Sequence, residues 1–476
     1  MFKRPNILLI MTDQQRYDYL SVNGGQCPAP ALERLAAEGA AFDNAYSVCS
    51  LCTPARASVL TGKYPHKHGL FNNCDMFSVV RERLPEDQTL INAPLAGAGY
   101  TCGYAGKWHI DRDLSALDHG FEGYSLPGYG NPWHDPTYRD HLAACGLTPP
   151  ELIPVIEVEN RPMTFVLDGP TEATVEHFQT DLAIDLLRKY AEDDGRPFFL
   201  TVQYWGPHEP ARPTKEYADR FPPEDTPLVP SFEDTLEGRP EQYRRHRDEF
   251  ECWYYGVSRL SRDAWRKATA MYYAYSAMID DQVSRVLAEL DALGLADDTL
   301  VLYTTDHGNL CGARGGLYDK GVAMFEDTYH IPLLARWPGV IAPGARHGQL
   351  VSNMDVFATI LDVAGARVPD DVDSRSMAPI LRDPSAAWPD DLMSWSSGVY
   401  YLHSQRMLRW DRYKYVFTPY AIDELYDLEA DPVETENRID DPSLADVRTE
   451  MRKRLIANAT RAADPLAEVM QGYFRV

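Results

Sequence analysis

The chain has 476 residues, of which 44% are hydrophobic and 25% charged, and it carries a formal net charge of −25 at pH 7. This length allows two or three domains with a large hydrophobic core, and the composition is that of an ordinary soluble globular protein. Because nucleic-acid binding requires clustered Lys and Arg, the acidic balance argues against a nucleic-acid partner.

Neither a targeting signal nor a membrane span is predicted. The apolar run from Ile7 to Met11 is too short for the core of a signal peptide and ends at polar residues. No stretch approaches the length of a membrane-spanning helix. The eight cysteines are irregularly spaced, which argues against a disulfide framework. We therefore expect a cytoplasmic protein without a membrane partner.

Four short apolar runs have the pattern of buried parallel strands, each ending in polar residues or a turn. In chain order they are 6–11, 197–204, 299–305 and 331–336. Apolar residues with helical spacing lie between them, over 178–191 and 265–293. This alternation predicts an α/β fold with a large mixed, mostly parallel sheet sandwiched by helices.

Two segments, 121–176 and 209–262, are rich in Pro, Gly, aromatic and charged residues and have little periodicity. We expect them to be loops or insertions over a site entrance, where substrate preference is usually determined. Their aromatic residues could line a pocket, although packing within the loops explains them equally well. The candidates are Trp133, His134, Trp253, Tyr254 and Tyr255.

The pattern changes after about residue 375. Short strands with hairpin-like spacing are predicted at 394–399, 407–410 and 413–417, and a polar helix at 444–461. We therefore divide the chain into a larger domain, 1–375, and a smaller C-terminal α+β subdomain with a small antiparallel sheet, 376–476.

Polar residues follow three of the predicted strands. Asp13 lies beyond the first, His208 beyond the second, and Asp306 and His307 beyond the third. Ligands of parallel sheets bind beyond the carboxyl ends of the strands, so these side chains can converge on one site. The alternative is that Asp13 and Asp306 only cap the helices that follow them.

The segment from Cys52 to Arg56, with the pattern C-x-P-x-R, is the most informative motif in the chain. Cys49 and Cys52 also have a C-x-x-C spacing, which would suit a redox pair or half of a zinc site, but no second C-x-x-C exists. A lone pentapeptide is weak evidence, and its weight depends on whether the rest of the chain supplies the same site.

The C-x-P-x-R motif and several later segments resemble those of the type I, formylglycine-dependent sulfatase family of the alkaline phosphatase superfamily. The resemblance covers nearly the whole chain. The C-x-P-x-R segment matches the first family signature. A second signature runs from Gly99 to His109, and further family-like blocks lie at 305–308, 325–339, 351–365 and 425–428. The resemblance implies an alkaline phosphatase-like sheet and makes 1–375 the catalytic sulfatase domain.

The resemblance implies that Cys52 does not act as a thiol. A partner, the formylglycine-generating enzyme, would oxidise it to Cα-formylglycine during synthesis, and the aldehyde would hydrate to a gem-diol. One diol oxygen would attack sulfur, and the other would lose its proton to expel sulfate. The implied substrate is a small-molecule sulfate ester, an aryl or alkyl sulfate. Ala55 stands where the family usually has Ser, which should not prevent the modification.

One divalent cation is also implied by the resemblance. Its expected ligands are Asp13, Gln14, Asp306, His307 and an oxygen of the modified Cys52. Two carboxylates and an amide oxygen suit a hard cation, which favours Ca²⁺. The imidazole nitrogen shifts the preference toward Mn²⁺ or Zn²⁺, and we take Mn²⁺ as the alternative. The commoner family set is Asp-Asp with Asp-Asn, and this chain departs from it.

Five further side chains receive roles from the resemblance. Lys107 and Lys320 are expected to hold the sulfate oxygens by charge. His109 would take the proton of the diol when sulfate leaves, and His208 would protonate the departing ester oxygen. Arg56 would steady the formylglycine and the metal-bound oxygens. In addition, Asn72 or Asn73 could reach the pocket.

A rival function keeps the nucleophile and changes the substrate. The Asp-Gln and Asp-His pairs also resemble those of choline-sulfatase-like enzymes and of formylglycine-dependent phosphonate monoester and phosphodiester hydrolases. Lys107 and His109 favour sulfate, because the resembling phosphonate hydrolases lack this Lys-x-His pair. A sulfate monoester and a phosphodiester both carry one negative charge, so we expect the enzyme to be promiscuous between them.

Two functions of other classes compete with ester hydrolysis by this nucleophile. In a non-catalytic binding protein, Cys52 would remain a thiol. A phosphatase or phosphomutase of the superfamily would use Ser or Thr as its nucleophile and would need two metals, for which the chain has too few candidate ligands. We also expect a homo-oligomer.

Overall fold

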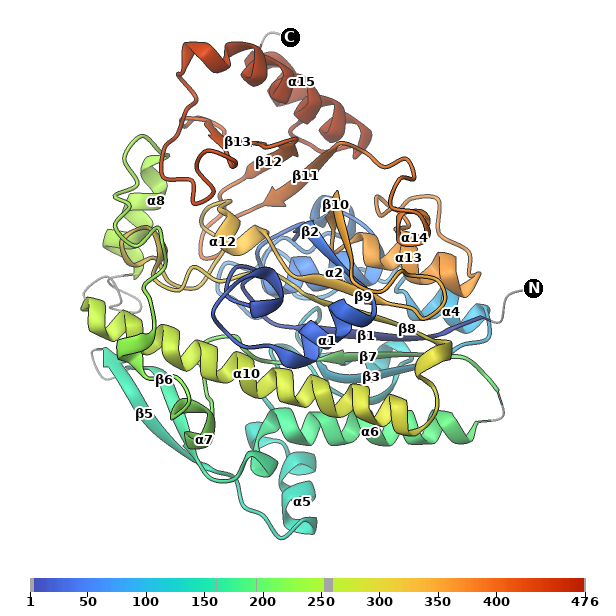
Figure 1. Ribbon diagram of the computed structural model, residues 1–476. Coiled ribbons are helices and arrows are strands. Elements are labelled where there is room, and N and C mark those ends of the chain that lie inside the picture. The colour runs from blue at the N-terminus through green and yellow to red at the C-terminus, as the bar shows by residue number, and fades with distance from the viewer. Residues whose placement is uncertain (1–3, 159–160, 194, 252–259, 475–476) are drawn as a thin grey trace.

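The computed structural model describes residues 4–158, 161–193, 195–251 and 260–474. Its centre is an eight-stranded sheet with the order β10-β2-β9-β8-β1-β7-β3-β4 (Figure 1). All neighbours in this sheet are parallel except β9, which runs antiparallel to both β2 and β8. In sheet order the strands are β10 (Ala345–Ser352), β2 (Ala40–Tyr46), β9 (Leu333–Arg336), β8 (Thr299–Thr305), β1 (Asn6–Thr12), β7 (Phe198–Gln203), β3 (Thr101–Lys107) and β4 (Glu122–Leu126). The predicted mostly parallel sheet is confirmed.

Strand β1 shows how the sheet is buried on both faces. Leu8 and Ile10 pack on one face with helices α1, α6 and α10, whereas Ile7 and Leu9 pack on the other with α2, α4 and α13. Alternate side chains of a strand point to opposite faces, so both sets are removed from water. Figure 1 shows α6 and α10 lying side by side below the sheet. The six helices are α1 (Pro30–Glu38), α2 (Cys52–Thr61), α4 (Asn92–Gly97), α6 (Val175–Glu192), α10 (Arg262–Ala292) and α13 (Asp355–Ala364).

We expected 121–176 to consist of loops or insertions, and the reading as loops is wrong. This segment contributes edge strand β4, helix α5 (Pro136–Ala144) and a separate hairpin formed by β5 (Glu151–Val158) and β6 (Arg161–Asp168). The described part of 209–261, before α10 begins at Arg262, contains only short helices. Besides α4, the short α-helices among the described residues are α3 (Pro65–His68), α7 (Lys215–Ala218), α8 (Glu241–Arg245), α11 (Ala313–Gly316), α12 (Glu326–Tyr329) and α14 (Ala378–Arg382).

The C-terminal part contains an antiparallel sheet, as predicted, with the order β11-β12-β13-β14. Its apolar face is covered by α15. The predicted position of the boundary between the two domains stays a prediction. The elements are β11 (Asp391–Ser396), β12 (Gln405–Trp410), β13 (Tyr413–Phe417), β14 (Glu424–Asp427), α15 (Ala445–Arg461) and α16 (Ala467–Phe474). Within the described residues, the helices are too short or too polar to cross a membrane.

Strand β11 joins this sheet to the loop that precedes α2. The backbone N–H of Trp395 donates to the carbonyl of Val48 at 2.8 Å, and the Ser394 hydroxyl donates to the carbonyl of Ser47, also at 2.8 Å. The Ser47 hydroxyl in turn donates to the carbonyl of Asp306 at 2.5 Å. The C-terminal sheet therefore holds the loop from which α2 begins.

Candidate active site

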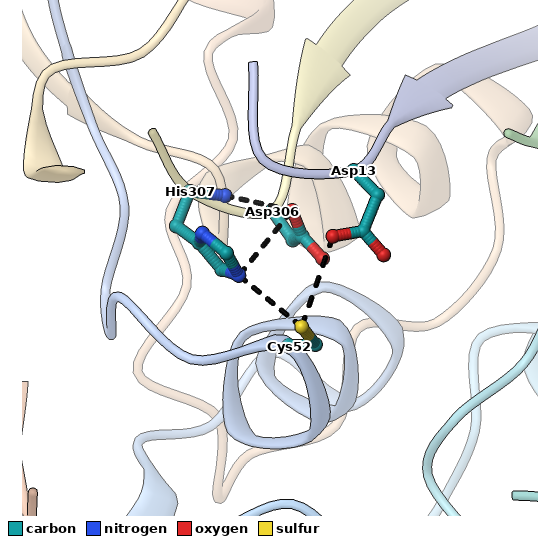
Figure 2. A group of neighbouring side chains, drawn as sticks. All are labelled: Asp13, Cys52, Asp306 and His307. Carbon is teal, nitrogen blue, oxygen red and sulfur yellow. Dashed lines mark hydrogen bonds and ion pairs between the residues drawn. The ribbon is translucent and has the colours of Figure 1, made fainter. Parts of the chain in front are cut away.

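The residues predicted to converge do converge. Asp13 follows β1, Asp306 and His307 follow β8, and Cys52 is the first residue of α2. One ligand atom from each of these four side chains lies within 4.8 Å of the others, and all four residues are fully buried (Figure 2). Capping of a helix does not account for a cluster drawn from three separate elements, so the convergence favours a functional site.

Arg56 lies one turn after Cys52 on α2 and joins the two carboxylates. Its Nε is 3.0 Å from Oδ2 of Asp306, and its Nη2 is 3.1 Å from Oδ2 of Asp13. Its Nη1 donates to Oε1 of Gln203, at the end of β7, at 2.9 Å. Burial by itself would raise the pKa of Asp13, but the opposing charges, with that of Lys107 the largest, hold the pKa well below its usual value. Asp13 is therefore a carboxylate.

The cluster fits a divalent cation. The Nδ1–H of His307 donates to the carbonyl of Gly308 at 2.9 Å, which leaves the Nε2 lone pair facing Sγ of Cys52 at 3.3 Å. The Cys52 sulfur is also 3.7 Å from Oδ1 of Asp13. A metal-binding histidine is usually held in this way by a hydrogen bond to its other nitrogen. Two carboxylates and one imidazole with a fixed tautomer are a suitable donor set for one such ion.

Gln14 lies beside this cluster, in a left-handed conformation with φ 65°. Its backbone N–H donates to Oδ1 of Asp306 at 2.9 Å, and its amide oxygen accepts a hydrogen bond from Nζ of Lys320 at 2.8 Å. Its amide nitrogen donates to Asp319 at 3.0 Å. A carbonyl oxygen has two lone pairs, so the bond from Lys320 leaves one for a cation. The role of Gln14 as a ligand stays a prediction.

Lys107 ends β3 inside the site. Its ammonium group pairs with Asp13 and lies 4.0 Å from the centre of the Tyr129 ring. Burial would lower the pKa of Lys107, but Asp13 raises it above its usual value, so the side chain is charged. Gly106, with φ 122°, allows β3 to lie close to β7. A Cβ at this position would lie 2.2 Å from the carbonyl oxygen of Gln203.

Lys320 and His208 form a hydrogen-bonded pair in which the lysine carries the positive charge. The Nδ1–H of His208 donates to the carbonyl of Glu209 at 2.6 Å, so its Nε2 accepts from Nζ of Lys320, 2.5 Å away. Burial and then Lys320 lower the pKa of His208 well below its usual value, whereas Asp319 and Cys52 raise that of Lys320. Nε2 of His208 therefore accepts a hydrogen bond from Lys320, and the expected role of His208 toward the departing ester oxygen stays a prediction.

His109 is held against the start of α2. Its backbone has φ 56°, and its carbonyl accepts a hydrogen bond from the Thr53 hydroxyl at 2.5 Å. Of the two candidate asparagines, Asn73 contacts the same turn, because its Oδ1 accepts from the backbone N–H of Thr53 at 2.9 Å. Asn72 instead donates to the carbonyl of Gly398 at 3.3 Å.

Sequence reasoning missed Tyr129, whose ring lies among three predicted site residues. Its centre is 5.4 Å from that of His109 and 5.6 Å from that of His208, in addition to its contact with Lys107. Of the proposed pocket aromatics, Trp133 packs near Tyr138 of α5 and His134 is exposed. The other three, Trp253, Tyr254 and Tyr255, lie outside the described residues.

Comparison with known families identifies the chain. A family model described as Sulfatase matches residues 5–366, and one described as N-sulphoglucosamine sulphohydrolase, C-terminal, matches residues 313–461. The chain belongs to the sulfatase family.

The C-x-x-C spacing does not form a shared site. Cys49 is buried and free, and among the described residues only Cys52 of the C-x-x-C pair contributes to the cluster with Asp13, Asp306 and His307.

Relatives of this sulfatase match it over most of its length. An arylsulfatase of Clostridium perfringens is 28% identical over 95% of this chain and 94% of its own. A choline-sulfatase of Rhizobium meliloti is 27% identical over 92% and 83%. The structure of a phosphonate monoester hydrolase from Silicibacter pomeroyi has a TM-score of 0.78 at 23% identity, covering 97% of this chain and 96% of the other. The sulfatase thus has an alkaline phosphatase-like fold and is a sulfuric ester hydrolase.

Proposed function

We propose that this sulfatase hydrolyses small aryl or alkyl sulfate monoesters, with residue 52 converted to formylglycine and with one divalent cation, Ca²⁺ in preference to Mn²⁺. The observation that carries the proposal is the buried cluster of Cys52, Asp13, Asp306 and His307. A thiol at this place would supply a nucleophile but no second group to release sulfate. A hydrated aldehyde would supply both a nucleophile and a second hydroxyl for the release of sulfate. A bound cation would act there as a Lewis acid.

Side chains of the chain itself supply the remaining chemistry. Lys107 and Lys320 would hold the sulfate oxygens from two directions, and buried charges act strongly on a developing negative charge. The proton on the Lys320–His208 pair would pass to the departing ester oxygen, so that the alcohol leaves neutral. His109 would take the proton released with sulfate. Arg56 fixes the two carboxylates and thereby the cation site.

A phosphonate monoester or phosphodiester is the second candidate substrate, because a phosphonate monoester hydrolase shares the fold. Lys107 and His109 both lie at the site, which supports sulfate as the better substrate. We expect kcat/KM for an aryl sulfate to exceed that for the matching aryl phosphonate on one preparation, with measurable activity toward both. A hundredfold preference for the phosphonate would replace our assignment with the second one.

An exposed ring near the site gives a prediction about the alcohol. Phe77 is 69% exposed, and its ring stacks on Tyr400 at a centre distance of 6.1 Å. The Tyr400 hydroxyl donates to Asp319, the neighbour of Lys320, at 3.2 Å. An aryl group can stack on such a platform for about 0.5–1.5 kcal/mol. Phe77→Ala should raise KM for an aryl sulfate about 2- to 10-fold and leave an alkyl sulfate unaffected.

Steady-state kinetics with both esters would check this prediction. Tyr420→Ala is the matched control, because Tyr420 is a 96% exposed aromatic residue in the C-terminal sheet region. An equal loss with aryl and alkyl sulfates would show that Phe77 does not contact the leaving group.

A further inference from the structure

Asp75 forms a hydrogen bond with His109 that the chemistry described above does not use. Oδ1 of Asp75 is 3.1 Å from Nε2 of His109. The imidazole is almost completely buried, whereas the carboxylate side chain, in the loop between α3 and α4, is 35% exposed. A carboxylate that contacts one nitrogen of a histidine determines which nitrogen carries the proton.

The tautomer of His109 follows from this contact. Burial would raise the pKa of Asp75, but the hydrogen bond from His109 lowers it to about 2, so at neutral pH the group is an anion and can only accept. Nε2 must therefore carry the hydrogen. In the neutral ring, Nδ1 then has a free lone pair.

Nδ1 of His109 is buried and has no hydrogen-bond partner among the described residues. An unpaired buried acceptor is unfavourable and requires an explanation, of which a catalytic role is one. The backbone of His109 is fixed next to the first turn of α2, because Thr53 donates to the His109 carbonyl and also accepts from the backbone N–H of Cys74 at 3.2 Å. Cys52 is the residue before Thr53.

We propose that Asp75 is a positioning residue that holds His109 as the Nε2–H tautomer, so that Nδ1 can accept the proton from residue 52 when sulfate leaves. The proposal rests on the proposed function. In this step the hydroxyl O–H bond breaks and its proton goes to Nδ1. The carbon–oxygen bond to sulfate breaks with its electron pair remaining on sulfate, and the carbonyl group forms again.

A competing use of the same residues is metal binding. Donor atoms of Cys74, Asp75 and His109 lie within 4.8 Å of one another. Burial raises the pKa of Cys74 to about 12, which keeps its thiol protonated and makes it a poor ligand. A metal at this place would displace the hydrogen from Nε2, so the two uses predict different imidazole signals.

The first test reads the tautomer directly and needs no turnover. Two-bond ¹H–¹⁵N spectra of ¹⁵N-histidine-labelled Cys52→Ala protein, with the His109 signals assigned by His109→Gln, should show Nε2–H alone. Asp75→Ala should give both tautomers, and so should Asp75→Asn, which serves if the alanine variant folds poorly. Asp181→Ala is the matched control, because Asp181 pairs with Nε2 of His141 at 3.2 Å away from the site. An unchanged His109 spectrum in both Asp75 variants, or a metal-bound Nε2, would overturn the proposal.

The second test separates positioning from a general structural effect. If Asp75 acts through His109 on sulfate release, Asp75→Ala should lower kcat about 10- to 100-fold and lower KM by a similar factor. The ratio kcat/KM, which reports the earlier attack on sulfur, should change less than about 3-fold. A fall of kcat/KM as large as that of kcat would contradict the proposal. Absence of an aldehyde at residue 52 would refute the proposed function but would leave the tautomer result unaffected.

Discussion

Replacing Cys52 with alanine should lower sulfatase activity about 10⁴-fold or more, because no other side chain in the cluster can take over as nucleophile. Cys52 is fully buried and its sulfur lies between Asp13 and His307. Alanine removes only this sulfur atom, so we expect activity to be lost without a change of fold. The measurement is the initial rate with an aryl sulfate. In active wild-type protein, the mass of the peptide that contains residue 52 should be that of an aldehyde, lighter than the thiol and reactive toward hydrazides.

Cys49→Ala is the control for this experiment. Cys49 is also buried and free, three residues before Cys52, but it does not belong to the cluster. Its replacement should leave the activity within a few-fold of wild type. Fully active protein with an intact thiol at residue 52 would disprove the proposed nucleophile, and a loss in both variants would instead indicate a redox or zinc pair.

Arg56→Ala should lower the free energy of unfolding by about 3–5 kcal/mol when no divalent cation is present. The substitution leaves two buried carboxylates, Asp13 and Asp306, without the charge that joins them. Because a divalent cation bound between these carboxylates would replace much of that charge, Ca²⁺ should recover a large part of the loss. Urea unfolding with a chelator and with excess Ca²⁺ measures both values.

Arg406→Ala provides the comparison for Arg56. Arg406 is equally buried and pairs with Asp464, far from the cluster along the chain, at 2.5 Å. This variant should be destabilised by a similar mechanism, but Ca²⁺ should stabilise it no more than it stabilises wild type. If Ca²⁺ helps both variants equally, the cation does not bind between Asp13 and Asp306.

The parts of the site that could be predicted are those with a local signal. Asp13 and Asp306 directly follow continuous apolar runs, so their place at the carboxyl edge of the sheet follows from the strands alone. Cys52 and Arg56 lie in a recognisable motif. Asp75 and Tyr129 have neither signal, because each reaches the site through a long loop or an irregular connection, and only the folded chain shows their contacts with His109.

The same reasoning explains which strands were missed. Strand β3 contains Gly103 and Gly106 and ends in Lys107, so it lacks the apolar run by which β1 and β8 were predicted. The glycines are required by close packing, since a Cβ at Gly103 would lie 2.3 Å from the Tyr190 hydroxyl. The apolar run of β9 predicted a strand correctly, but such a run does not indicate direction, and β9 is antiparallel to both of its neighbours.

The burial of Cys52 would restrict when the proposed modification can take place. An oxidising enzyme cannot reach this side chain in the folded protein. The hydrogen bond from the backbone N–H of Trp395 to the carbonyl of Val48 also fixes the preceding loop in place. Residue 395 is synthesised long after residue 52, so the nascent chain offers an interval in which the cysteine is accessible. If residue 52 is converted as we propose, a molecule that completed folding first would keep its thiol and would lack the proposed nucleophile.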